Sequence, residues 1–231
     1  MNFHIIKKTI GWILIFEALF FFVPILTALI YREKEVWDFL ICAGIAAAVG
    51  GLLVIGKVKN NAIYTKEGFV IVALSWIVMS LFGALPFYIS RCIPSYVDAL
   101  FETVSGFTTT GASILPSGEA IEALPKCMLM WRSFTHWVGG MGVLVFIIAF
   151  LPLSGAQNMH MMKAESPGPS VGKLLPKMRS TAGVLYLIYT VLTALEIILL
   201  VFDMPVFDAI NASLASLSAY SSTNIPSANL R

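Results

Sequence analysis

Long apolar segments recur along the chain, and each one is long enough to cross a membrane as a helix. A helix needs about 20 predominantly apolar residues to cross the hydrocarbon core of a bilayer. The pattern predicts an all-α membrane protein with five transmembrane helices. The five expected spans are Ile10–Tyr31, Trp37–Ile55, Glu67–Ile89, Cys127–Leu153 and Thr181–Phe202.

Two further helical stretches are too short to cross a bilayer. They are Tyr96–Ser105 and Val206–Ser218, and each follows a full span and carries polar residues. Such segments suit helices that enter the membrane only halfway. We therefore expect a re-entrant helix after the third span and a second one after the fifth.

The composition agrees with a membrane protein. Of the 231 residues, 58% are hydrophobic and 12% are charged, and the mean hydropathy is +0.85. This balance excludes a soluble domain with a large core. Lys7 and Lys8 precede an apolar run that is longer than the core of a signal peptide and has no convincing cleavage site, so the first span is expected to be retained.

The distribution of charge fixes the expected orientation. Cations gather before the first span and in every second connection, whereas the other connections are balanced or acidic. Cytoplasmic loops carry the excess of lysine and arginine in membrane proteins. We therefore expect a multi-pass protein with a cytoplasmic N-terminus. The cations that set this orientation are Lys7, Lys8, Lys57, Lys59, Lys66, Lys163, Lys173, Lys177 and Arg179.

A polar, threonine-rich segment, Glu102–Ser113, lies between the third and fourth spans. Irregular backbone at membrane depth is tolerated only where it is buried in protein or lines a water-filled path. The setting favours a re-entrant pore loop that enters from outside and offers backbone carbonyls to a cation. The alternative is an ordinary extracellular loop rich in threonine and glycine.

The carbonyls of four residues are the expected cation ligands: Thr108, Thr109, Thr110 and Gly111. Carbonyl oxygens can replace the hydration shell of potassium because they are polar, uncharged and closely spaced. Gly111 allows a backbone conformation that other residues avoid. Thr109 and Thr110 are the central K⁺ ligands of this hypothesis.

The short helix before these residues is expected to support the cation. Gly106 is the expected helix stop, and the negative end of the helix dipole would face the ion. Asp98 near the helix start complements the positive end.

A weak internal repeat links the two short helices. Asp98-Ala99-Leu100 and Asp208-Ala209-Ile210 are separated by 110 residues, and the same offset pairs Thr103 with Ser213. Repeats of this kind are typical of channels and transporters. The repeated unit is expected to be helix, half-helix, loop and helix.

Three segments carry a resemblance to a known family. The run Asp98–Ala112 resembles the first pore loop of the Trk/Ktr/HKT potassium transporter superfamily. Trp137–Gly142 is similar to the family's sequence after that loop, and Ala164–Pro169 is similar to its cytoplasmic loop. The two spans before the first repeat point to the TrkH type.

The resemblance implies a pore-forming subunit for potassium uptake in the bacterial inner membrane. In that family four repeats in one polypeptide surround a single pore, and each contributes one filter strand. The subunits form homodimers, and a cytosolic nucleotide-binding subunit of the TrkA or KtrA type gates them. Potassium is the transported ion, and neither a further cofactor nor a nucleic-acid partner is expected.

The chain departs from the family in its second repeat. Ser221 stands where the family normally has glycine. The expected organisation is an extension over residues 1–60, a first repeat over 61–155, a cytoplasmic linker over 156–180 and a truncated second repeat over 181–231. We expect a truncated, frameshifted or fragmentary form that does not conduct alone. The alternative is a non-conducting membrane remnant that associates with full-length subunits.

Four ionisable residues inside the spans leave open interpretations. Glu17 is expected to have a packing role, and Glu196 is either functional or hydrogen-bonded to a neighbouring helix. Arg132 and His136 share one helix face; they either tune the vestibule or, as we favour, Arg132 snorkels to the interface while His136 is hydrogen-bonded.

The glycines of the fourth span, Gly139, Gly140 and Gly142, are expected to permit close helix packing, with a gating point as the alternative. An intramembrane enzyme would need a nucleophile with a base or a metal cluster. The spans show neither pattern, so no enzymatic activity is expected.

Overall fold

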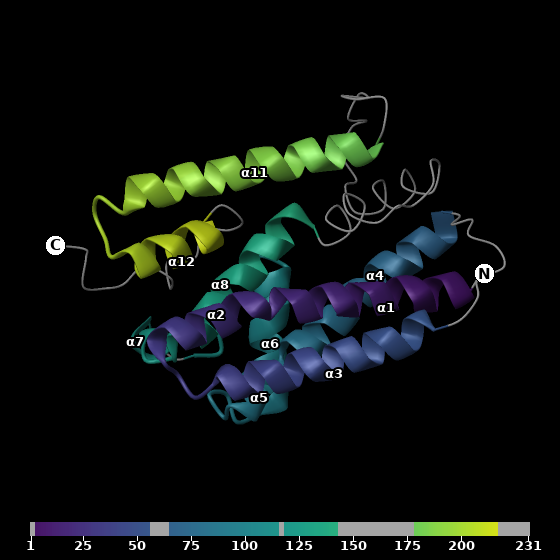
Figure 1. The fold of residues 1–231 in the computed structure, drawn as a ribbon, viewed down its shortest axis with the longest axis horizontal. Helices are drawn as coiled ribbons and strands as arrows, with labels where there is room; N and C mark the ends of the chain where they lie inside the picture. Colours follow the sequence, from purple (N-terminus) through teal and green to yellow (C-terminus); the bar gives the residue numbers. More distant parts are fainter. Residues whose placement is uncertain (1–2, 56–64, 116–117, 143–177, 217–231) are drawn as a thin grey trace.

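The computed structural model describes residues 3–55, 65–115, 118–142 and 178–216, and the regular structure in these residues is entirely helical (Figure 1). The helices are α1 (Phe3–Phe20), α2 (Phe22–Tyr31), α3 (Val36–Val54), α4 (Thr65–Gly83), α5 (Leu85–Ile89), α6 (Tyr96–Phe107), α7 (Gly118–Glu122), α8 (Lys126–Met141), α11 (Met178–Leu200) and α12 (Val206–Ser216).

Four stretches in the described part of the chain are long and apolar enough to cross a membrane: Phe3–Tyr31, Val36–Val54, Glu67–Ile89 and Gly183–Leu200. They correspond to four of the five expected spans. The first begins seven residues earlier than expected, because the charged pair Lys7–Lys8 lies within α1 rather than before it.

The expected fourth span, Cys127–Leu153, does not form one continuous helix. The helix α8 ends at Met141, and Gly142 follows with a φ of 78°, a conformation that cannot extend a right-handed helix. The remainder of the expected span, residues 143–153, lies outside the described residues.

Two spans are interrupted shortly before a proline, between α1 and α2 and between α4 and α5. Pro24 lies in the first turn of α2, and Pro86 lies in the first turn of α5. Proline has no N–H and its ring crowds the carbonyl four residues earlier, so a continuous helix bends or breaks before it. Neighbouring backbone bonds such as Ile25 N–H to the Phe21 carbonyl keep the two halves of the first span joined.

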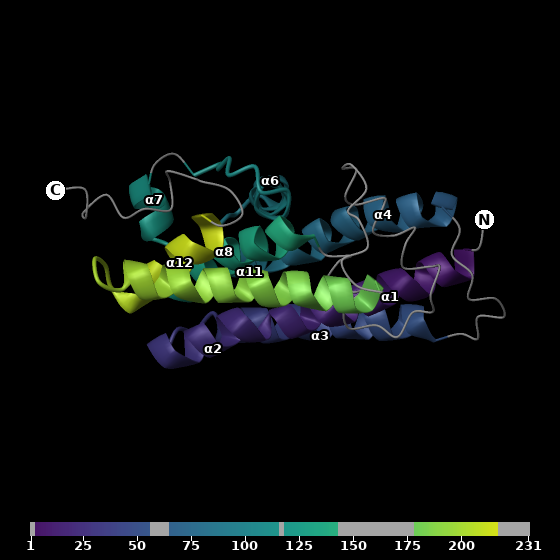
Figure 2. The ribbon, with the colours of Figure 1, turned by 90° about the horizontal axis from the view of Figure 1, so that it is seen from above.

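The long helices run alongside one another, with α1 and α3 forming the closest pair (Figure 2). Gly11 and Gly50 allow this approach. A Cβ on Gly50 would lie 2.7 Å from the Gly11 carbonyl oxygen, and a Cβ on Gly11 would lie 2.8 Å from the Gly50 oxygen. The start of α1, the end of α3 and the starts of α4 and α11 lie at one end of the bundle, as the expected orientation requires (Figure 1).

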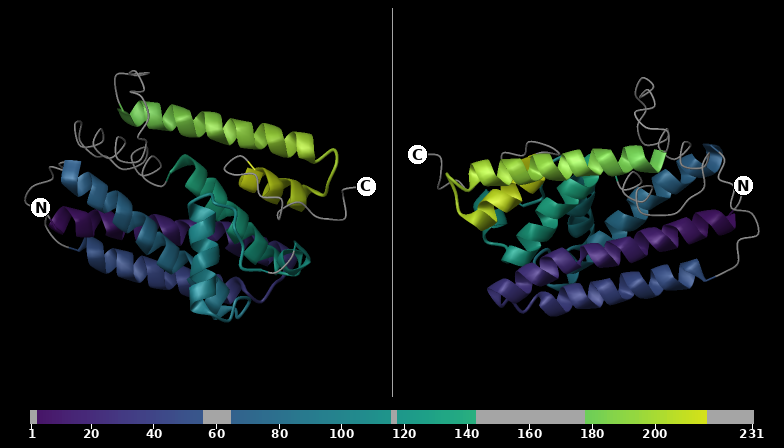
Figure 3. Two further views of the ribbon diagram at one scale, coloured as in Figure 1. Left: turned by 180° about the vertical axis from the view of Figure 1, so that it is seen from behind. Right: turned by 45° about the horizontal axis from the view of Figure 1, so that its top comes forward.

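The short helix α6 runs across the direction of the long helices and packs against α4 and α8 (Figure 3). An aromatic cluster of Phe21, Phe39, Phe107 and Trp131 joins it to the core. The indole N–H of Trp131 also donates to the carbonyl of Gly83 at 2.9 Å. The end of α6 is therefore held by the first, second, third and fourth spans together.

Candidate functional site

The candidate site begins with the helix α6, whose first turn is capped. Ser95 has extended backbone geometry, and its hydroxyl accepts a hydrogen bond from the Asp98 N–H at 3.4 Å. A serine in this position satisfies one of the N–H groups that the helix leaves unpaired. Asp98 itself lies in the first turn, where a carboxylate interacts favourably with the positive end of the helix dipole.

The C-terminus of α6 closes with a left-handed residue. Thr109 has a φ of 56°, its N–H donates to the Gly106 carbonyl, and the N–H of Thr110 donates to the Ser105 carbonyl, both at 2.9 Å. This pair of bonds is the Schellman arrangement. The expectation that Gly106 stops the helix is wrong: Gly106 lies inside α6, which ends at Phe107.

Gly106 has a packing role instead. A Cβ at this position would overlap the hydroxyl oxygen of Thr135 on α8. The side chain of Thr135 is turned back on its own helix, where it donates to the carbonyl of Arg132 at 2.7 Å. Only a residue without a side chain allows α6 and α8 to approach this closely.

An irregular strand, Thr110–Ser113, leaves the helix end. Thr109 and Gly111 both have left-handed φ values, 56° and 73°, whereas Thr110 between them does not. A left-handed φ at two of three successive residues departs from the geometry of an ordinary strand. Ala112 ends this stretch, because its carbonyl accepts a hydrogen bond from the Ser105 hydroxyl.

The threonine hydroxyls fix the beginning of the strand. Thr108 Oγ1 donates to the Val104 carbonyl at 2.7 Å and also lies 2.8 Å from Thr110 Oγ1. These bonds give the exposed hydroxyls of Thr108 and Thr110 partners within the protein.

A buried ion pair lies behind the strand. Glu102 on α6 accepts a hydrogen bond from the Ser113 hydroxyl, which lies 3.0 and 3.2 Å from its two carboxylate oxygens, and one from the Ile114 N–H at 3.0 Å. The Nε of Arg132 on α8 donates to the same carboxylate at 2.5 Å. Both charged side chains are only 1–2% exposed.

This pair corrects the interpretation of Arg132. We expected its guanidinium to snorkel to the membrane interface, but it points inward to Glu102. His136, one turn later, places Nδ1 3.0 Å from the Arg132 carbonyl, which agrees with the expected hydrogen-bonded histidine. No spacing along the sequence predicts this pair, because Glu102 and Arg132 are 30 residues apart on different helices.

The glycines at the end of α8 differ in their surroundings. A Cβ on Gly139 would overlap the carbonyl of Phe107, so Gly139 has the expected packing role. Gly140 is exposed, and nothing in the described contacts assigns it a packing role. Gly142 ends the helix, and its carbonyl accepts a hydrogen bond from the Tyr186 hydroxyl of α11 at 3.4 Å.

The second short helix repeats the placement of the first. Asp208 occupies the third position of α12 as Asp98 does in α6, and Ser213, like Thr103, is buried. Glu196 of α11 accepts hydrogen bonds from Ser213 and Ser216, so it joins the span to the short helix that follows it.

Glu17 lies outside the segment Glu102–Ser113 but close to residues that pack against α6. It is fully buried, neither carboxylate oxygen has a hydrogen-bond partner among the described residues, and Oε1 would lie 3.2 Å from a Cβ on Gly83. The same position on Gly83 would contact Thr103 and Phe107 of α6. The carboxyl group of Glu17 thus lies at the place where Gly83 of α4 packs against α6.

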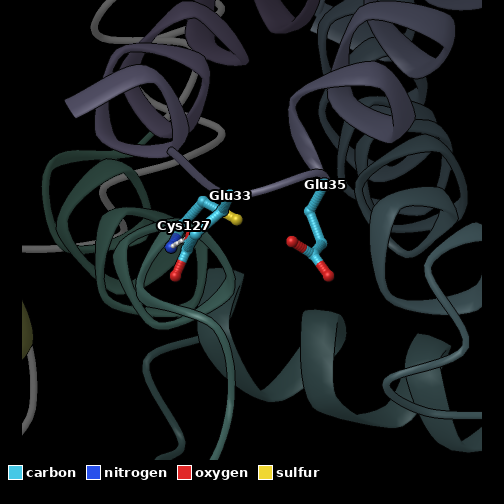
Figure 4. A group of neighbouring side chains, drawn as sticks. All are labelled: Glu33, Glu35 and Cys127. Carbon is cyan, nitrogen blue, oxygen red and sulfur yellow. Dashed lines mark hydrogen bonds between the residues drawn. The ribbon is translucent and has the colours of Figure 1, made fainter. Parts of the chain in front are cut away.

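One group of potential metal ligands lies away from the strand. Glu33, Glu35 and Cys127 place one ligand atom each within 4.8 Å of one another (Figure 4). Glu33 already has a structural role, since its two carboxylate oxygens accept the N–H groups of Lys126 and Cys127 at 2.6 and 2.9 Å. It therefore caps the start of α8 from the α2–α3 connection.

Several sequence expectations fall outside the described residues. They concern the motif Ala164–Pro169, residues 156–177 of the expected cytoplasmic linker, and the segment of the second repeat around Ser221. The structure describes the pore-loop and α8 motifs alone.

The comparisons with known proteins agree with the geometry of the described helices. Residues 38–223 match the model of the TrkH family, which is described as a cation transport protein. The chain is 37% identical over 222 residues to the Trk system potassium uptake protein TrkH of Escherichia coli K12, and 34% identical over 219 residues to TrkG of the same strain.

A solved structure shares the fold. The crystal structure of the potassium transporter TrkH from Vibrio parahaemolyticus superimposes with a TM-score of 0.75 and 31% sequence identity, over 93% of this chain and 42% of that one. The E. coli TrkH match covers 94% of this chain and 45% of the relative, so the chain spans about half the length of the curated relatives it matches. The chain is a multi-pass membrane protein and belongs to the TrkH cation transport family.

Proposed function

We propose that this chain contributes a potassium-selective pore loop to a Trk-type uptake system in the bacterial inner membrane. The proposed ligands are the backbone carbonyls of Thr108, Thr109, Thr110 and Gly111. The observation that carries the proposal is the strand after α6, in which left-handed conformations at Thr109 and Gly111 alternate with Thr110. We infer that this alternation turns the carbonyls of the segment towards one side, where they can replace the hydration shell of a potassium ion.

Three features support this assignment. The C-terminal end of α6 carries a partial negative charge of about half an elementary charge, which favours a cation beyond it. The hydroxyls of Thr108 and Thr110 are bonded to each other, and Thr108 also donates to the Val104 carbonyl, which steadies the start of the segment. The strand belongs to a family whose relatives include potassium uptake proteins by name.

The membrane arrangement is part of the proposal. We place the N-terminus in the cytoplasm, α6 as a re-entrant helix entering from outside, and α8 as the first half of the fourth span. The organisation into an extension (1–60), a first repeat (61–155), a linker (156–180) and a second repeat (181–231) follows from the same arrangement. By family likeness we also propose pairing of subunits and gating by a cytosolic nucleotide-binding subunit.

The function is tested in bacterial cells that lack potassium-uptake systems. The chain is expressed alone, as a baseline, and together with the part of E. coli TrkH that it does not match. We expect potassium uptake and growth at low potassium in the co-expressing cells. The variant Gly111→Ala should abolish this uptake, because alanine is strained at a φ of 73°.

The matched control is Gly118→Ala, since a Cβ on Gly118 meets no atom within 4 Å. Uptake that survives Gly111→Ala as well as Gly118→Ala would contradict the pore-loop assignment. Absence of uptake in every arm, combined with co-purification of the chain with full-length TrkH, would favour a non-conducting assembly role instead.

A further inference from the structure

The strand Thr110–Ser113 is held at both of its ends by the same helix. At its start, Thr109 and Thr110 donate to carbonyls in the last turn of α6. At its finish, Ser113 and Ile114 donate to the carboxylate of Glu102, more than one turn earlier in that helix. The segment between them can shift only if one of these attachments is released.

Glu102 holds its position because a second helix fixes it. Arg132 of α8 donates to Oε1, and the pair is 1–2% exposed. A buried ion pair is costly to desolvate, and apolar side chains of similar size are often equally stabilising. Its presence is therefore poorly explained by stability alone, and its hydrogen bonds to the strand offer a better reason.

The second short helix has a different residue at the equivalent position. The offset of 110 residues places Ala212 at the position of Glu102, and Ala212 is buried in the packed face of α12. A glutamate is therefore not required to form a short helix of this type. The carboxylate at this position is a feature of α6 that α12 does not share.

Arg132 belongs to a face of α8 that lies along the loop. Thr135 lies against Gly106, and Gly139 lies against the carbonyl of Phe107. These contacts fix the helix that carries Arg132 relative to the helix that carries Glu102. The ion pair consequently transmits the position of α8 to the outer end of the strand.

We propose that Glu102 and Arg132 are positioning residues that hold the outer end of the pore strand and thereby set the preference for potassium over sodium. The inference rests on the proposed function, because it concerns the carbonyls of Thr108–Gly111. Potassium and sodium differ in size, so oxygens that are held apart disfavour the smaller ion, whereas a released strand can close around it. Loss of the pair should change ion preference more than total uptake.

The anchor is tested first without transport, by hydrogen–deuterium exchange on the purified full chain in detergent. In the variant Glu102→Gln, we expect the protection of the Ile114 amide to fall about tenfold, as expected when a hydrogen bond to a charged group is replaced by a weaker one. The control Val97→Ala changes an exposed side chain on the same helix, 72% exposed, and should leave this protection unchanged.

Transport is measured in the co-expressing cells described above. Glu102→Gln and Arg132→Gln should both lower the ratio of potassium to sodium uptake by about tenfold, the factor that corresponds to 1.4 kcal/mol of discrimination. Arg132→Lys, which keeps the charge, should restore part of the ratio. A general loss of folding would instead lower both uptakes together and would not distinguish lysine from glutamine.

The outcomes separate the two proposals. Unchanged Ile114 protection in Glu102→Gln, or an unchanged ion ratio in cells with normal uptake, would overturn the positioning role and leave the pore loop intact. Lack of uptake by the unmodified chain in the co-expressing cells would overturn the proposed function. In that case the exchange measurement still decides whether Glu102 anchors the strand.

Discussion

Gly139 of α8 lies directly against the carbonyl of Phe107, the last residue of α6. A Cβ at Gly139 would overlap that oxygen and also lie 2.8 Å from the carbonyl carbon. The obstacle is backbone, which cannot rotate away as a side chain would. Any residue larger than glycine must therefore displace the end of α6, and with it the strand that begins at Thr110.

Gly139→Ala is accordingly expected to destabilise the protein and reduce uptake. Inserting a methyl group into a tightly packed contact costs about 1–3 kcal/mol. The measurement is the thermal unfolding temperature in detergent, together with potassium uptake in the co-expressing cells. Gly183→Ala is the matched control, because a Cβ on Gly183 in α11 meets nothing within 4 Å. Equal behaviour of the two variants would remove the packing argument.

The contact between α1 and α3 provides a second pair of matched variants. A Cβ on Gly50 would lie 2.7 Å from the Gly11 carbonyl, whereas a Cβ on the adjacent Gly51 meets nothing. We expect Gly50→Ala to lower the unfolding temperature, since small residues let membrane helices approach closely. Gly51→Ala should leave it unchanged or raise it slightly, because alanine is the better helix former. A drop for Gly51→Ala alone would contradict this arrangement.

A substitution at Thr109 is expected to stabilise the protein, unlike the glycine substitutions above. A β-branched residue at a φ of 56° is strained, and left-handed conformations cost L-residues about 1–2 kcal/mol relative to glycine. Thr109→Gly should therefore raise the unfolding temperature and preserve uptake, because the main chain remains. Thr109→Ala keeps the strain and should give no such gain. A lower unfolding temperature for Thr109→Gly would show that the threonine side chain contributes more than its strain costs.

Labelling of Cys92 can test the orientation of the chain in the membrane, and the labelling rate should depend on pH. It is partly exposed in the connection between α5 and α6, whereas Cys42 and Cys127 are buried. Burial raises the pKa of the Cys92 thiol above its ordinary value of 9.0, and the Ser90 hydroxyl counteracts this only partly. Because the thiolate is the reactive form, labelling should be slow at neutral pH. The labelling rate should increase with pH and should still be increasing at pH 9.0.

The reagent for this measurement is a membrane-impermeant maleimide added to intact spheroplasts. We expect Cys92 to be labelled from outside, and Cys92→Ser to remove the signal. Labelling that requires permeabilised membranes would place the α5–α6 connection in the cytoplasm and reverse the proposed orientation.

The spans and the short helices could be predicted from the sequence because their signals are local. Apolar runs of sufficient length identified four of the spans, and the repeated Asp-Ala pair located the first turns of α6 and α12. The end of α6 could not be predicted in this way. Gly106 looked like the stop, but its missing side chain accommodates Thr135, and the left-handed position fell on Thr109, a residue type that rarely adopts it.

The ion pair behind the strand was also beyond sequence reasoning. Glu102 and Arg132 come together only because α6 crosses α8, and no spacing along one helix relates them. A charged residue inside a predicted span was a signal that something unusual occurs there. The identity of its partner depended on the tertiary packing of the two helices.

The carboxylate of Glu33 gives the first two spans a part in the folding of the loop. It occupies the connection between α2 and α3, yet it binds the N–H groups that open α8. The helices of residues 3–54, called the brace below, consequently stabilise the start of the helix that carries Arg132 and Gly139. Heating should melt this brace and the loop in a single cooperative step, and a protein deprived of the brace would begin α8 with unpaired amides.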